Sequence, residues 1–200
     1  MLKNLALLSL VLTFTSVALA QQSESFGPGH YYTKDGVKRS GLLRFNYGGN
    51  LFTDKSDGDC SLTFKTDKKA KKEKFTTNDI CCFVIKKDSF AIIKNFKLNA
   101  FAKYPQDFAK VIEMGKISLY MYYATVNQGQ FGVVTVTDWV IEKDGTTTKL
   151  TRKQFRELMP DYLQDYPELL AKFQSKELKY DDAPHIIKEY NLYFAKGAAD

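Results

Sequence analysis

The stretch over residues 80–96, ICCFVIKKDSFAIIKNF, constrains the fold of this chain more than any other. Two runs rich in β-branched and aromatic residues flank a polar tip at residues 86–89. Such runs around a polar tip predict a β-hairpin. In the first run, over residues 80–85, positions of both parities are apolar, which is typical of a strand buried on both faces. We therefore expect this hairpin to lie inside a sheet.

The patterns on either side of this hairpin divide the chain into a β half and a helical half. Asp-Gly pairs at residues 35–36 and 144–145 supply the positive φ that tight hairpin turns need. Thr151 then opens a T-x-x-Q capping box, which marks the start of a helix. The sequence predicts an α+β fold: a mainly antiparallel β-sheet of hairpins over residues 30–150, with a C-terminal cluster of short helices over residues 151–195 packed on it.

Prolines and one aspartate shape the expected helices. Pro160 lies within the first helical pattern, where it is expected to kink or divide the helix. Asp165 is expected to cap the second helix, with Pro167 in its first turn. A last helix is expected from about Asp182. All three helices are short and amphipathic, so they need the sheet to pack against.

The first twenty residues predict export. One Lys is followed by a mostly apolar run over residues 5–12 and by an Ala-Leu-Ala ending, which indicates a signal peptide over residues 1–20. The apolar run is too short for a bilayer core of about 30 Å, so we expect no transmembrane segment after cleavage. Residues 21–29 are expected to be a flexible lead-in, and residues 30–200 a single domain. The protein is thus expected to be secreted or periplasmic.

The charge of the chain gives no sign of a nucleic-acid partner. A net charge of +6 is spread along a sequence that also carries many acidic residues. A patch of one sign, of the kind that steers nucleic acid, is not evident. We therefore expect no nucleic acid among its partners.

Three cysteines, Cys60, Cys81 and Cys82, raise the question of a disulfide. Adjacent Cα atoms are about 3.8 Å apart, below the usual minimum of about 4.4 Å for a disulfide, so a bond between the two neighbours would be strained. In an oxidising compartment the better candidate joins Cys60 to Cys82 or Cys81. Neighbours on a strand point to opposite faces, so only one of the two could face Cys60. Three free thiols are the alternative.

A tyrosine row is the candidate binding face. In the alternating strand over residues 117–125, Tyr120 and Tyr122 share one face. A row of this kind could bind a glycan or a peptide, whereas the alternative is that both rings belong to the core of an ordinary sheet. A second long strand, over residues 131–142, is expected to pair with this one through a short loop.

Catalytic, cofactor and metal motifs are missing from the sequence. Neither His30 nor His185 has a cysteine or carboxylate at zinc-ligand spacing, and no G-x-S-x-G, phosphate loop or dinucleotide fingerprint occurs. We therefore assign no catalytic residue, no cofactor and no metal. An unrecognised enzymatic site would need a cleft that gathers His185 with a cysteine or with the paired acids Asp181 and Asp182.

Several segments beyond residue 20 share the pattern of one family. They are Tyr31-Tyr32 followed by Gly36 and Gly41 with four residues between, residues 74–83, residues 115–122, Pro167-Glu168-Leu169, and Tyr180-Asp181-Asp182 leading to Tyr190-Asn191. In these segments the chain resembles a family of uncharacterised secreted proteins from Bacteroidetes bacteria. It departs from that pattern at Val37-Lys38, where Asp-Thr is usual, and at Tyr166, where Cys is common. The resemblance implies export in a Gram-negative bacterium and brings no catalytic residue with it.

Two functions from different classes follow from these observations. The first is an exported cell-envelope protein that acts as a non-enzymatic binding or interaction module for a protein or a glycan. The alternative is a hydrolase or a redox enzyme with an unrecognised site. The first agrees better with a sequence that has an export signal and lacks catalytic motifs.

Overall fold

The computed structural model describes residues 25–48, 60–98, 103–127, 130 and 133–197. The expected signal peptide over residues 1–20 lies outside this part of the chain. The end of the expected lead-in is not flexible chain, because residues 27–29 open the first strand and pair with residues 41–43. Within the described ranges no helix has the length and apolar character that a bilayer crossing requires.

Ten strands in the described part of the chain form one sheet in the order β10-β9-β8-β7-β6-β5-β1-β2-β3-β4. Adjacent strands pair in antiparallel fashion throughout this order. The strands are β1 (Gly27–Thr33), β2 (Lys38–Asn46), β3 (Ser61–Lys65), β4 (Glu73–Phe75), β5 (Ile80–Ile85), β6 (Asp88–Lys97), β7 (Lys103–Glu113), β8 (Ile117–Asn127), β9 (Val133–Lys143) and β10 (Thr146–Lys149). The prediction of a mainly antiparallel sheet is confirmed.

The β5–β6 hairpin lies in the middle of the sheet, between β1 and β7, as its apolar pattern predicts. Its turn is tighter than the four polar residues suggest, because Ile85 already pairs with Asp88. Only Lys86 and Lys87 remain in the turn, and Lys86 has a φ of 55°. A two-residue hairpin needs this positive φ so that its twist matches that of the strands.

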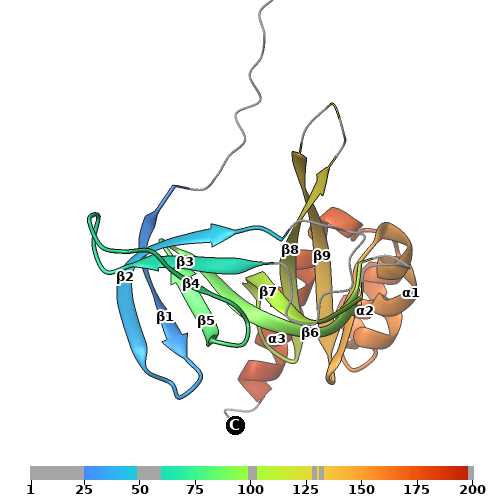
Figure 1. Cartoon of the computed structure of the whole chain (residues 1–200). Helices are drawn as coiled ribbons and strands as arrows, with labels where there is room; N and C mark the ends of the chain where they lie inside the picture. Colours follow the sequence, from blue (N-terminus) through green and yellow to red (C-terminus); the bar gives the residue numbers. More distant parts are fainter. Residues whose placement is uncertain (1–24, 49–59, 99–102, 128–129, 131–132, 198–200) are drawn as a thin grey trace, which may run out of the picture.

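The sheet curls strongly along its length (Figure 1). In β6, Asn95 has a φ of 53°, and it lies opposite Pro105 of β7, which has no N–H to donate. Asn tolerates the left-handed region better than most residues, so it can bend the strand there. The curl brings the end of β2 onto β8, where Gly48 forms a parallel bridge with Ala124 and accepts a hydrogen bond from Thr125 N at 2.6 Å.

Strand β8 separates two hydrophobic clusters because its side chains alternate between the two faces of the sheet. Ile117 and Leu119 pack against the helices, whereas Tyr120 and Tyr122 pack inside the curl with aromatic side chains of β2, β5 and β6. Both faces of β8 are therefore buried at this level. This explains why so many of its residues are apolar or aromatic.

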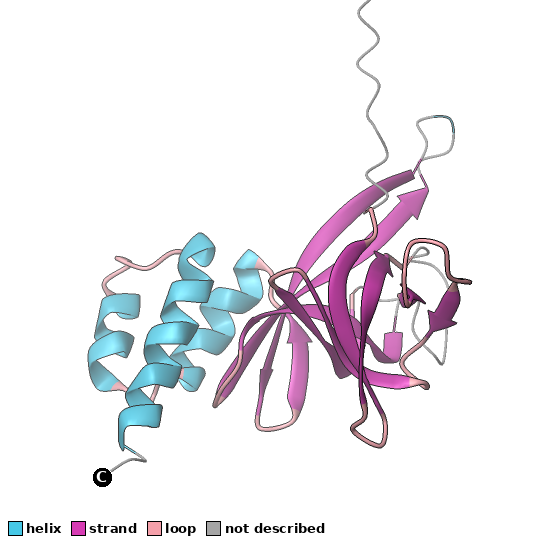
Figure 2. Cartoon of the chain, turned by 90° about the vertical axis from the view of Figure 1, so that its left-hand side faces the viewer, coloured by secondary structure: helices cyan, strands magenta, loops and turns pink. Residues whose placement is uncertain are grey.

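Three helices pack together on one side of the sheet, as Figure 2 shows: α1 (Arg152–Tyr162), α2 (Pro167–Gln174) and α3 (Ala183–Gly197). Thr151 caps α1 in the predicted capping box, with Gln154 reaching back to the Thr151 N–H at 3.0 Å. Pro160 does not divide α1, which continues through it to Tyr162. Helices packed on an antiparallel sheet agree with the expected α+β class.

Candidate functional site

Tyr120 and Tyr122 lie in the core and do not form an accessible binding face. Their side chains are only 4% and 1% exposed. The Tyr122 hydroxyl donates to Asp107 at 2.7 Å, and the Tyr120 hydroxyl donates to Glu142 at 3.3 Å. The face that these tyrosines share is covered because the sheet curls over it. The alternation along β8 was correctly predicted, but its interpretation as a binding surface does not fit this burial.

A buried polar cluster surrounds Asp107, which is 0% exposed. Its carboxylate accepts hydrogen bonds from Tyr122 OH at 2.7 Å, Phe108 N at 2.7 Å and Cys60 N at 3.1 Å. Strands β7 and β8 pair only up to Lys110 and Met121 at this end. The carboxylate therefore provides acceptors where the ladder between the two strands has ended. A buried charge needs such partners, because leaving it unpaired would cost several kcal/mol.

Cys60 belongs to this cluster but is a poor nucleophile. Its Sγ accepts from Gly48 N at 3.2 Å and donates to the carbonyl O of Tyr123 at 3.7 Å. Burial, followed by the negative charge of Asp107, raises the pKa of the Cys60 thiol well above its usual value. At neutral pH the thiol is thus protonated, whereas catalytic cysteines need a lowered pKa and access to solvent. The cluster is suited to holding the strands together.

The candidate disulfide between Cys60 and Cys82 or Cys81 is not present, and all three cysteines are free thiols. The reason is a β-bulge in β5. Tyr32 of β1 pairs with Cys82, whereas the next residue, Thr33, pairs with Ile80, so Cys81 is an extra residue without a counterpart. The rule that neighbours on a strand point to opposite faces does not hold at a bulge.

Burial along β5 shows where the bulge places the two side chains. Ile80 and Phe83 are both buried although they are three positions apart, whereas Cys81 and Cys82 between them are both half-buried. The two Sγ atoms are 3.5 Å apart. The bulge therefore brings the two thiols together instead of directing one of them toward Cys60.

The residues expected in an unrecognised enzymatic site lie at exposed positions in the helical part of the chain. His185 lies on α3, where its side chain is 77% exposed and approaches Glu189 one turn along the helix. Asp181 forms an exposed ion pair with Arg152, and Asp182 accepts from Lys179 N. Across the described ranges, no three His, Cys, Asp or Glu side chains gather as they would around a metal ion.

A candidate binding element is the open edge of a strand. Strands β8 and β9 run out beyond the rest of the sheet as a two-stranded arm in Figures 1 and 2. On one side β9 pairs with β8 along its full length, but on the other side β10 covers only residues 140–143. In the described chain, residues 133–138 of β9 have no strand on that second side.

The direction of the backbone groups on this edge can be derived from one hydrogen bond. Trp139 O accepts from Leu150 N at 2.7 Å, so Trp139 directs its backbone groups away from β8. Backbone groups alternate along a strand, so Thr135 and Thr137 also direct N–H and C=O outward. Both threonines are exposed. They offer two donors and two acceptors to an incoming strand.

Sequence reasoning found the strand but not its open edge. The pattern over residues 131–142 predicts a long strand, and the Asp-Gly pair at residues 144–145 predicts the turn that leads into β10. How much of β9 the shorter strand covers depends on the register, which two short Thr-rich segments do not encode strongly.

Comparisons of the chain with protein-family models, with curated proteins and with solved structures found no match.

Proposed function

We propose that this is an exported cell-envelope protein that acts as a binding module and takes up an extended segment of another protein as an additional strand on β9. Export is supported by the signal-peptide pattern over residues 1–20 and by the family resemblance. The observation that carries the binding function is the open edge of residues 133–138. Addition of a strand to such an edge is a common way to bind a peptide.

The composition of this edge favours a protein partner. Natural proteins usually protect an edge strand with Lys, Pro, a bulge or a covering segment. Residues 133–138 of β9 read VVTVTD, without Lys or Pro, and β-branched residues dominate. The one charged residue, Asp138, is held by Lys149 of β10 at 2.7 Å. The unprotected edge is therefore suited to a segment that is extended and rich in β-branched residues.

Proline substitutions test this edge without disturbing the β8–β9 ladder. Thr135→Pro and Thr137→Pro remove N–H groups that point away from β8, so the fold should tolerate them. Each lost hydrogen bond is worth about 0.5 to 1.5 kcal/mol, and the rings also block an incoming strand. We expect the double variant to lose at least tenfold in capture of partner proteins from an envelope extract, measured by crosslinking and quantitative mass spectrometry.

The matched control is the Thr135→Val, Thr137→Val double variant, which changes the same two side chains and keeps both N–H groups. We expect it to capture the same proteins as the wild type. Equal capture by the proline variant, with an unchanged thermal midpoint, would rule out strand addition. Loss of a homodimer in the proline variant, measured by sedimentation, would instead identify a second copy of this chain as the segment that binds.

A further inference from the structure

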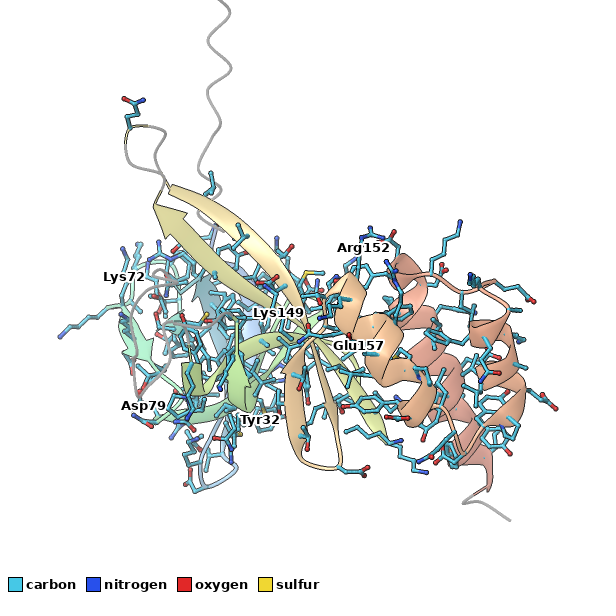
Figure 3. The ribbon with its side chains drawn as sticks, turned by 90° about the vertical axis from the view of Figure 1, so that its right-hand side faces the viewer. Tyr32, Lys72, Asp79, Lys149, Arg152 and Glu157 are labelled. Carbon is cyan, nitrogen blue, oxygen red and sulfur yellow. The ribbon has the colours of Figure 1, made fainter. Side chains whose placement is uncertain are left out.

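Cys81 and Cys82 lie side by side on the outer side of the buried core. Their Sγ atoms are 3.5 Å apart, and Cys81 Sγ also donates to the carbonyl O of Tyr32 at 3.5 Å. Figure 3 shows Tyr32, the residue paired with Cys82, on the sheet, away from the helix that carries Arg152 and Glu157. We propose that these two thiols form a site that binds one trivalent metalloid centre of the arsenite type through both sulfur atoms.

The distance between the sulfur atoms fits a single bound centre. Two sulfurs at about 2.3 Å from one atom, the length of a zinc–thiolate bond, are about 3.3 to 3.8 Å apart when the angle lies between a right angle and the tetrahedral value. The observed 3.5 Å falls within this range. Both bonds can therefore form without movement of the backbone. Binding to such a pre-organised site loses less conformational entropy.

The adjacency of the two cysteines also keeps the pair available as thiols. A disulfide between adjacent residues is strained, so it is easily reduced again. The third cysteine, Cys60, is buried against Asp107 and Tyr123, which leaves no other thiol in the described chain to compete. The pair therefore stays reduced under conditions that oxidise cysteines of ordinary spacing.

A neutral metalloid hydroxide suits two thiols that lie 3.5 Å apart. An arsenic(III) hydroxide reacts with the thiols themselves: two S–H and two As–OH bonds break, two As–S bonds form, and two waters leave. Neither sulfur nor arsenic changes its oxidation state.

Phenylarsine oxide is a suitable probe, because it condenses with two thiols and releases one water. We expect the reduced protein to form a one-to-one adduct by intact-mass spectrometry, displaced by excess 2,3-dimercaptopropanol. Cys81→Ser and Cys82→Ser should each weaken binding at least 100-fold, because a single As–S bond loses the chelate. Both positions are half-buried, so the fold should persist, and thermal midpoints check this. If the Cys82→Ser variant proves unstable, Cys82→Ala replaces it in the test.

A spacing control keeps the number of thiols constant. In the Cys81→Ser, Val84→Cys double variant the two cysteines stand two residues apart on one strand face, with their Cα atoms about 6.6 Å apart, so their thiols are not held together by the bulge. We expect this variant to bind as weakly as the single variants. Binding as tight as that of the wild type in any of these three variants would overturn the proposal.

Discussion

The side chain of Asn191 joins α3 to β8 by binding both backbone groups of Ile117. Asn191 Oδ1 accepts from Ile117 N at 3.0 Å, and Asn191 Nδ2 donates to Ile117 O at 2.7 Å. Glu113, the last residue of β7, pairs with Leu119, so Ile117 lies beyond the end of the β7–β8 ladder. The amide thus takes the place of a strand residue. Gly115 makes room for it, since a Cβ there would lie 2.4 Å from Asn191 Cγ.

Replacement of Asn191 should destabilise the protein strongly. Asn191→Ala leaves a buried N–H and a buried C=O without partners, which costs about 2 to 4 kcal/mol in the free energy of unfolding. The neighbouring Leu192 is 49% exposed and serves as the control, since Leu192→Ala should change stability by less than about 0.5 kcal/mol. Urea unfolding measures both. Equal losses would mean that the amide only fills space.

The two buried tyrosines give a second prediction, because they share one face of β8 but differ in their acceptors. Tyr122→Phe removes a donor from the fully buried Asp107, so we expect a loss of about 1.5 to 3 kcal/mol in the free energy of unfolding. Tyr120→Phe removes a longer bond to the partly buried Glu142, and we expect less than about 1 kcal/mol. If the two variants are equally stable, the Asp107 cluster does not hold the strands.

The sequence was informative wherever local pattern decides structure. The β5–β6 hairpin, the Thr151 capping box and the alternation along β8 all follow from residues within one element, and the structure confirms them. The pattern of β5 also holds a weak sign of its bulge. Ile80 and Phe83 are three positions apart, which breaks the period of two, but the apolar cysteines between them conceal it.

Features that depend on distant segments could not be predicted in this way. The sequence around Asp107 gives no sign that Cys60 and Tyr122 will contact it, because the three come together only when the sheet curls. The start of β7 is not evident from the sequence for a related reason. Pro105 predicts a break, yet the strand begins at Lys103, since the missing N–H of Pro105 lies opposite the bent Asn95.

Asp165 has a different role from the helix cap that the sequence predicts. The pattern Asp-Tyr-Pro predicts that it caps α2, but the N-cap is Tyr166, which makes no side-chain capping bond. The Asp165 carboxylate instead accepts from Lys116 Nζ at 2.5 Å and from Tyr190 OH at 2.8 Å. It thereby links the turn between β7 and β8 to α3. The ion pair with Lys116 takes the place of the local cap.

This link predicts how stability changes in acid. Burial alone would raise the pKa of Asp165, but the hydrogen bonds from Lys116 and Tyr190 outweigh it, so the pKa is lowered below its ordinary value of 3.8. A carboxyl group with a lowered pKa in the folded state stabilises the protein above its ordinary pKa, and this contribution disappears as the pH falls through the folded value. The wild type should therefore lose stability relative to Asp165→Asn below about pH 4. Chemical unfolding at successive pH values measures the difference between the two proteins.

A substitution of Lys116, the ion-pair partner of Asp165, separates this effect from general acid unfolding. Lys116→Gln removes the same ion pair from the other side, so it should flatten the same part of the pH curve. The double variant should then add little, because two residues that act through one interaction are not additive. A difference between wild type and Asp165→Asn that stays constant from pH 6 to pH 3 would show that the carboxylate acts through its shape and not its charge.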